Sequence, residues 1–163
     1  KTVQSFEQLS IETIDSDIHT TDDGLYALNT FICKHKILGG NLIQRDIHNI
    51  KKKIASVITS QSNKSFAKVR PKTKKIFEYR TKIYITDIPK KNRTHITLET
   101  LDKPNLLSKV AKIFLDHGVS IDSARITTLG EKVEDNFTVI DEKTKLALSK
   151  NKAQLLQKKF KSL

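Results

Sequence analysis

The 163-residue sequence predicts an α+β fold made of two small, related domains. Three observations lead to this prediction: strand-like and helix-like apolar patterns alternate, a short stretch recurs, and charge is unevenly distributed. Residues 13–21 return as residues 120–128, with the Ile, Asp, Ser and both Thr of the stretch identical. Two copies are too few for a solenoid, so they indicate a tandem pair of domains of one type.

The net charge of +12 is concentrated in two segments. Residues 64–82 carry eight basic residues against Glu78, and residues 149–163 carry five basic residues and no acidic one. We therefore expect a first domain at residues 1–63, a basic linker at 64–81 and a second domain at 82–163. Aromatic residues interleave with the charges of the linker, so a nucleic-acid-binding module is an alternative, although we expect no nucleic-acid partner.

The first domain is expected to contain a helix, two strands and a second helix. The expected elements lie at residues 3–9, 11–21, 25–34 and 47–57. The second helix follows from Ile47, Ile50, Ile54 and Val57, which recur at helical spacing. An opening strand is missing, which we interpret as a truncation. Another strand, or a second chain, would then pair with the open sheet.

The second domain is expected to contain four strands and two helices. The strands are rich in β-branched residues or alternate between apolar and polar residues, and lie at residues 82–88, 94–101, 119–128 and 133–140. Pro104 is expected to open the first helix, because its missing N–H has no helical partner there. Gly118 is expected to end that helix with a positive φ, and Ser149 to cap the second helix.

The stretch Leu101-Asp102-Lys103-Pro104-Asn105-Leu106-Leu107 lies between a strand and a helix, and with this element order it resembles an ACT domain, a ferredoxin-like fold. Residues 110–120 and 124–137 are similar to the last ACT domain of the bifunctional uridylyltransferases/uridylyl-removing enzymes, and residues 17–31 to the penultimate one. The resemblance implies a regulatory region that senses glutamine. That region would bias the enzyme between adding uridylyl groups to the nitrogen regulator PII and removing them.

The resemblance also implies partners and a location. Glutamine is expected as effector, PII as a partner through the parent enzyme, an ACT–ACT homodimer, no membrane and a cytoplasmic location. Because the catalytic domains of that family precede this region, we expect no catalytic residue and no cofactor in this chain, and Mg for the parent enzyme. An ACT dimerisation domain without ligand is an alternative.

Asp102 is the principal candidate ligand residue, because it precedes a predicted helix N-terminus. Its carboxylate is expected to pair with the α-amine of an amino acid, while the N–H groups of Asn105 and Leu106 take the ligand's carboxylate. A capping role for Asp102 without a ligand is the alternative. By analogy with amino-acid-binding ACT domains, Thr100 and Ser120 are expected to flank the same loop. Asn105 replaces the glycine usual in the family, and asparagine tolerates a positive φ.

Asp15 and Asp17 suggest a different chemistry. Carboxylates two positions apart on a strand share a face, and nucleotidyltransferases hold metals with such pairs. No third carboxylate is evident and the second copy of the repeat carries Ala124 in place of Asp17, so we expect no metal site. The single cysteine, Cys33, excludes an intrachain disulfide and a cysteine-based zinc cluster.

Overall fold

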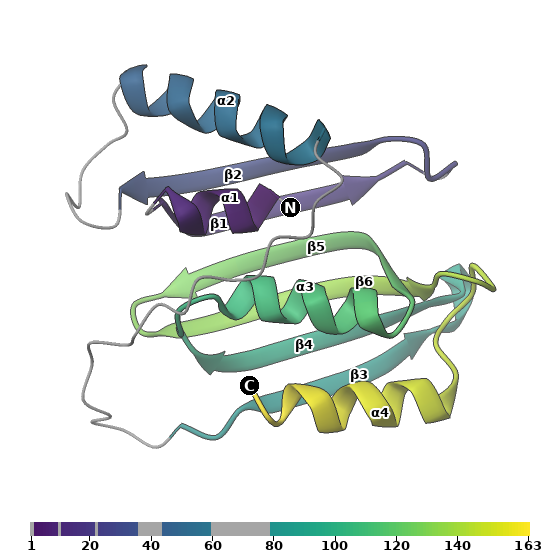
Figure 1. Cartoon of the computed structure of the whole chain (residues 1–163). Coiled ribbons are helices and arrows are strands. Elements are labelled where there is room, and N and C mark those ends of the chain that lie inside the picture. Colours follow the sequence, from purple (N-terminus) through teal and green to yellow (C-terminus); the bar gives the residue numbers. More distant parts are fainter. Residues whose placement is uncertain (1, 10, 22, 36–43, 60–78) are drawn as a thin grey trace. The chain divides into compact units, whose positions relative to one another are not determined.

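The computed structural model describes residues 2–9, 11–21, 23–35, 44–59 and 79–163 of the chain (Figure 1). The chain forms two compact units, one of Lys1–Thr13 with Cys33–Glu78 and one of Ile14–Ile32 with Tyr79–Leu163. The division at residues 63 and 82 stays a prediction, and residues 60–78 of the basic segment lie outside the described residues. Among the described helices, none combines the length and the apolar character that a bilayer span requires.

The first unit contains two helices and the adjoining ends of two strands. The elements are α1 (Thr2–Gln8), β1 (Ile11–Thr20), β2 (Ala27–His35) and α2 (Gln44–Thr59). Helices α1 and α2 contact each other, and Phe6 and Ile11 are buried. Lys34 on β2 forms an ion pair with Glu12 on β1 at 3.3 Å. The predicted order of helix, two strands and helix is confirmed.

The second unit contains the β-α-β-β-α series that the sequence predicts, preceded by a strand and a short 3-10 helix. The elements are β3 (Lys82–Ile88), η1 (Pro89–Lys91), β4 (Arg93–Leu101), α3 (Leu106–Asp116), β5 (Val119–Leu129), β6 (Lys132–Asp141) and α4 (Lys150–Phe160). The side chain of Ser149 accepts a hydrogen bond from the N–H of Lys152, as expected for a cap. Gly118 has a φ of 60°, which confirms its place at the helix end.

The strands form one sheet in the order β2-β1-β5-β6-β4-β3. The pairs from β1 through β5, β6 and β4 to β3 are antiparallel, so the α+β class is confirmed and is consistent with a ferredoxin-like fold. Strand β3 pairs with β4, which confirms that the strand before Pro89 completes a sheet. The two copies of the repeat are neighbours: Asp15 lies opposite Thr127 and His19 opposite Ser123. The finer assignment to ACT domains stays a prediction.

Helices α3 and α4 pack against one face of the second unit's strands and enclose its core. Phe114 lies at the centre, with edge-on contacts to Phe137 on β6 and Phe160 on α4 at ring distances of 5.2 and 5.4 Å. Burial of one such side chain contributes about 1.5–3 kcal/mol. The alternate positions of β4 that face this core are all buried: Thr94, Ile96, Leu98 and Thr100.

Helix α3 begins later than the sequence predicts. Its first residue is Leu106 rather than Pro104, and its cap residue is Asn105. Asn105 has φ 63° and ψ 23°, a left-handed conformation that cannot continue a right-handed helix. A turn that the N–H of Leu106 closes onto the carbonyl of Lys103, at 3.1 Å, therefore separates Pro104 from the helix.

Candidate functional site

The loop between β4 and α3 carries Asp102 and Asn105, and Leu106 follows as the first residue of α3. The N–H of Asp102 donates to the carbonyl of Glu131 at 2.8 Å, which ties the loop to the turn between β5 and β6. Asn105 has a positive φ, a conformation that asparagine and glycine both tolerate, so the structure is compatible with either residue here. The Asp102 side chain is exposed, so a ligand in solution can reach it.

The prediction that Leu106 offers a free N–H is wrong. That N–H donates to the carbonyl of Lys103, because the left-handed residue before it folds the loop into a tight turn. A ligand carboxylate at this helix end would have to use other amides. The role of Leu106 as a ligand residue therefore stays a prediction without the donor on which it was based.

Thr100 and Ser120 do not flank the same loop. Thr100 lies opposite Val133 near the start of β6, whereas Ser120 lies opposite Ile140 near its end. At ~3.3 Å per residue these positions are roughly 23 Å apart along the strand. The cause is the helix between them: α3 carries the chain back along the sheet, so β4 ends and β5 starts at opposite ends. Thr100 is buried, and its hydroxyl lies 2.9 Å from that of Thr81.

A buried carboxyl group that is not among the predicted ligand residues is close enough to Asp102 for the charge of Asp102 to act on it. Asp135 on β6 has an exposed fraction of 0%, and no hydrogen-bond partner reaches either carboxylate oxygen. It lies opposite Leu98 on β4 and Ile126 on β5, both buried. On the core face of the sheet, Asp135 thus lies between two aliphatic side chains.

The surroundings of Asp135 oppose its negative charge. Burial raises the pKa of Asp135, and the negative charge of Asp102 raises it further, to about 7, against a smaller lowering effect from the backbone of Thr127. Burial dominates because a carboxylate that leaves water loses its hydration, and the weak contact with the backbone of Thr127 offsets only a small part of that loss. The charge of Asp102 in the exposed loop therefore affects the ionisation of Asp135 on the buried face of β6.

The alternation of β6 could have identified Asp135. Val133, Phe137 and Val139 occupy the core-facing positions of this strand, and Asp135 interrupts that apolar series with an ionisable group. A charged residue on the apolar face of a strand is unusual without a partner.

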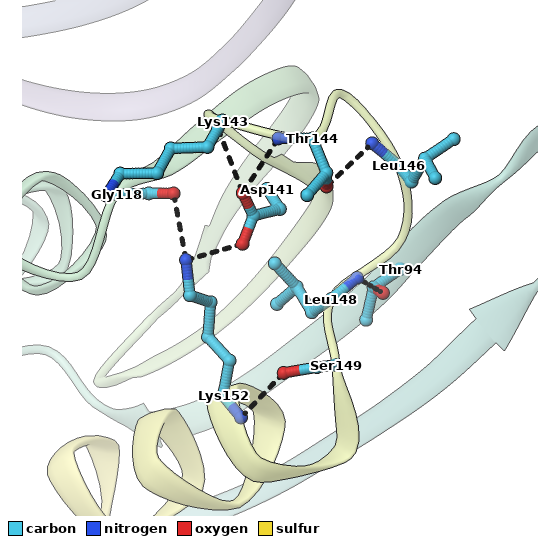
Figure 2. A network of polar contacts seen from close by, with 9 residues as sticks. All are labelled: Thr94, Gly118, Asp141, Lys143, Thr144, Leu146, Leu148, Ser149 and Lys152. Carbon is cyan, nitrogen blue, oxygen red and sulfur yellow. Dashed lines mark hydrogen bonds and ion pairs between the residues drawn. The ribbon is translucent and has the colours of Figure 1, made fainter.

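Asp141 at the end of the same strand has the opposite surroundings, which Figure 2 shows. Its carboxylate accepts from Lys152 Nζ at 2.6 Å and from the N–H groups of Lys143 and Thr144 at 2.9 and 3.1 Å. Hydrogen bonding to Lys152 is the largest cause that lowers the pKa of Asp141 to about 2. Lys152 Nζ also donates to the carbonyl of Gly118 at 3.3 Å, so this network joins β6, α4 and the turn after α3.

The aspartates of the first repeat face basic groups rather than each other. Asp15 lies 4.0 Å from Arg125 on β5, and Asp17 lies 3.4 Å from His19. Within the described part of the chain, no three His, Cys, Asp or Glu side chains gather as a metal site would require. Cys33 is half-buried, and burial raises the pKa of its thiol, which makes it a weaker nucleophile.

The comparisons with known proteins point in one direction. The chain is 30% identical over 158 residues to a bifunctional uridylyltransferase/uridylyl-removing enzyme of Psychrobacter arcticus, which covers 96% of the chain. Enzymes of the same name from Idiomarina loihiensis and Vibrio campbellii are 31% and 30% identical, over 96% and 86% of the chain. The chain is homologous to a C-terminal region of this enzyme.

The homology covers only a part of each bifunctional uridylyltransferase/uridylyl-removing enzyme. The chain spans 16–18% of the length of these three relatives. No protein-family model matches the chain. The resemblance to this enzyme family is therefore confirmed over nearly the whole chain, while the activity of the whole enzyme belongs to a much longer protein.

Proposed function

We propose that this chain is a regulatory, glutamine-sensing ACT region of a bifunctional uridylyltransferase/uridylyl-removing enzyme. The homology over up to 96% of the chain is the observation that carries the proposal. Through the parent enzyme, the region would bias the addition of uridylyl groups to PII against their removal. The described residues contribute the sensor, and the chemistry would lie elsewhere in the parent enzyme.

The loop from Leu101 to Leu107 is the proposed ligand site. Asp102 offers an exposed carboxylate for the α-ammonium group of an amino acid. The turn at Asn105 keeps the loop compact. The hydrogen bond from the N–H of Asp102 to the carbonyl of Glu131 fixes the loop to the sheet. Buried Thr100 and Asp135 lie on the core face of the strands beneath the loop. Ser120, at the far end of the sheet, is left out of this proposed site.

Ligand binding is tested by thermal unfolding of the chain with glutamine, glutamate and no ligand. Glutamine should raise the melting temperature in proportion to RT ln(1 + [L]/Kd), and glutamate should raise it less. Asp102→Ala should abolish the shift and still unfold cooperatively. Asp116→Asn is the matched control, because Asp116 is an exposed aspartate at the other end of α3. No shift at millimolar glutamine would contradict the proposal.

Dimerisation without a ligand is the second candidate function, and strand β2 favours it. Among the described strands β2 lies at the edge of the sheet, and its side chains Leu28 and Ile32 are 71% and 56% exposed. An exposed apolar edge strand readily pairs with another strand. Light scattering that finds a dimer, which Leu28→Lys converts to a monomer, would support this function. The absence of a shift with any amino acid would favour it over sensing.

Nucleic-acid binding has less support. Tyr79 is the described aromatic residue of the basic segment, and its hydroxyl donates to Glu99 at 3.3 Å while Lys132 lies 5.2 Å from its ring centre. To stack on a base, this ring would have to exchange these contacts for the base. A labelled RNA whose affinity fell steeply with salt would revive this alternative.

A further inference from the structure

Among the described residues, few buried side-chain oxygens have no hydrogen bond, and the residues that carry these oxygens lie in one row of the sheet. These oxygens belong to Ser16 and Asp135. Ser16 lies opposite Ile126, and Ile126 lies opposite Asp135, so the three side chains share a face. Such groups are uncommon in folded proteins and require an explanation. Asp135 requires the stronger one, because its group can carry a full charge.

The charged groups around Asp135 can be named element by element. On β4 and β5 its in-register neighbours are Leu98 and Ile126, while Glu99 and Arg125 alternate to the opposite face. The buried face of α3 carries Leu106, Ser108, Val110 and Phe114, none of them charged. The charge that acts on Asp135 among the described residues is that of Asp102. Within the described part of the chain, no positive charge acts on Asp135.

We infer that Asp135 is the second carboxyl group of the ligand site: it holds a proton in the free protein and releases it when a ligand's ammonium group binds at Asp102. This inference rests on the proposed function. A cation at Asp102 cancels the repulsion that Asp102 exerts on Asp135 and places a positive charge near the buried group. The O–H bond of Asp135 breaks, its proton goes to the solvent, and its carboxylate remains as part of the ligand's counter-charge.

The arrangement explains how an exposed aspartate could bind a small zwitterion in water. An exposed ion pair alone contributes only about 0–1 kcal/mol. A buried carboxylate interacts with a cation in a medium of lower dielectric constant, where the attraction is stronger. The site would therefore select ligands with an ammonium group, and the selection would depend on pH.

Isothermal titration of the chain with glutamine tests the inference, because it counts protons. At pH 7, in two buffers of different ionisation enthalpy, the wild type should release about half a proton per ligand. Its affinity should rise about five-fold from pH 6 to pH 7, and less than two-fold from pH 7 to pH 8. The ammonium group of glutamine stays protonated over this range, so the slope belongs to the protein.

Two variants separate the proton linkage from a merely structural role. Asp135→Asn should bind glutamine more weakly, release no proton and lose the pH slope. Asp116→Asn should keep both the proton release and the slope. If Asp135→Asn does not fold, ¹³C NMR of the wild-type carboxyl carbons replaces it: the resonance of Asp135 should titrate near neutral pH without glutamine and at clearly lower pH with it.

The failures of the two proposals differ. Glutamine binding without proton release, or with an unchanged titration of Asp135, would overturn this inference and leave the sensor function intact. Binding of no amino acid at pH 6, 7 or 8 would overturn both.

Discussion

Strand β6 carries two aspartates whose surroundings are opposite. Asp141, at the strand's end, accepts hydrogen bonds from one lysine and two backbone N–H groups, and its pKa falls to about 2. Asp135, on the core face of the same strand, has no hydrogen-bond partner for its oxygens, and its pKa rises to about 7. One strand thus holds a carboxylate that hydrogen bonds stabilise and a buried carboxyl group whose charged form is disfavoured.

Whether a carboxyl group has hydrogen-bond partners indicates its role better than its burial alone does. A partnered carboxylate is explained by its partners, because it joins β6 to α4 and to the turn at Gly118. A buried carboxyl group without partners weakens the fold at neutral pH, because its charged form loses hydration in the folded state. Groups of the second kind concentrate at functional sites. The part of the molecule near Asp102 and Asp135 therefore deserves the first experiments.

The largest effect is expected when Asp135 loses its charge. In the unfolded chain its carboxyl group ionises near pH 4, but in the folded chain only near pH 7. Between these values the folded state binds the extra proton, so the free energy of unfolding falls as pH rises. Asp135→Asn should remove this fall. Between pH 4 and pH 8 its free energy of unfolding should therefore rise by about 2–4 kcal/mol relative to that of the wild type. Urea denaturation at several pH values measures the difference.

Asp116→Asn is the control for that series, because Asp116 is exposed and forms an ion pair with Lys112 on its own helix. Its stability curve should run parallel to the wild type. If the curve of Asp135→Asn were parallel as well, the buried group would not ionise between pH 4 and pH 8, and the contrast along β6 would disappear.

A smaller effect, of opposite sign, is expected at Asp141. Lys152→Met removes the ammonium group and leaves Asp141 with its two backbone donors, so the melting temperature should fall by a few degrees at pH 7. Because the pKa of Asp141 is lowered, its stabilisation is present above about pH 4 and is lost as pH falls through about 2. The difference between variant and wild type should shrink over that range. Lys150→Met, at an exposed position of the same helix, should change little at any pH.

The smallest effect is expected at Asn105, where conformation rather than charge is tested. Asn105→Ala places a residue with a Cβ and no compensating amide at a φ of 63°, and should lower the free energy of unfolding by about 1 kcal/mol. Asn105→Gly is the matched variant and should be neutral or slightly stabilising. Thermal unfolding compares them. Equal stability of the two variants would mean that the left-handed turn is not maintained in solution.

Local patterns in the sequence were sufficient to predict the elements. Strand β4 could be predicted because β-branched residues alternate along it, and the end of α3 because Gly118 is placed where a positive φ is needed. The predicted start of α3 at Pro104 is wrong, because a proline can either open a helix or lie in a turn just before it. Asn105 adopts a positive φ, which places Pro104 in such a turn. The sequence could not show this, because an asparagine tolerates a positive φ but does not require one.

The candidate site was harder to predict, because it depends on which strands are neighbours. Thr100 and Ser120 were placed together from their proximity to one loop in the sequence, whereas the parallel course of β4 and β5 separates them. The pairing of β1 with β5 joins residues about a hundred positions apart, and no local pattern encodes it. Asp135 was visible as an interruption of an apolar series, but its relation to Asp102 required the fold.

The segment that leads into β3 holds the end of β4 in place. Tyr79 is anchored to Glu99, and Thr81 to Thr100, just before β4 reaches the loop that holds Asp102. Strand β3 then follows β4 in continuous register from Lys82 opposite Glu99 to Ile88 opposite Arg93. The base of that loop is therefore held from two sides, by these two side-chain contacts and by the hydrogen bond from the N–H of Asp102 to the carbonyl of Glu131.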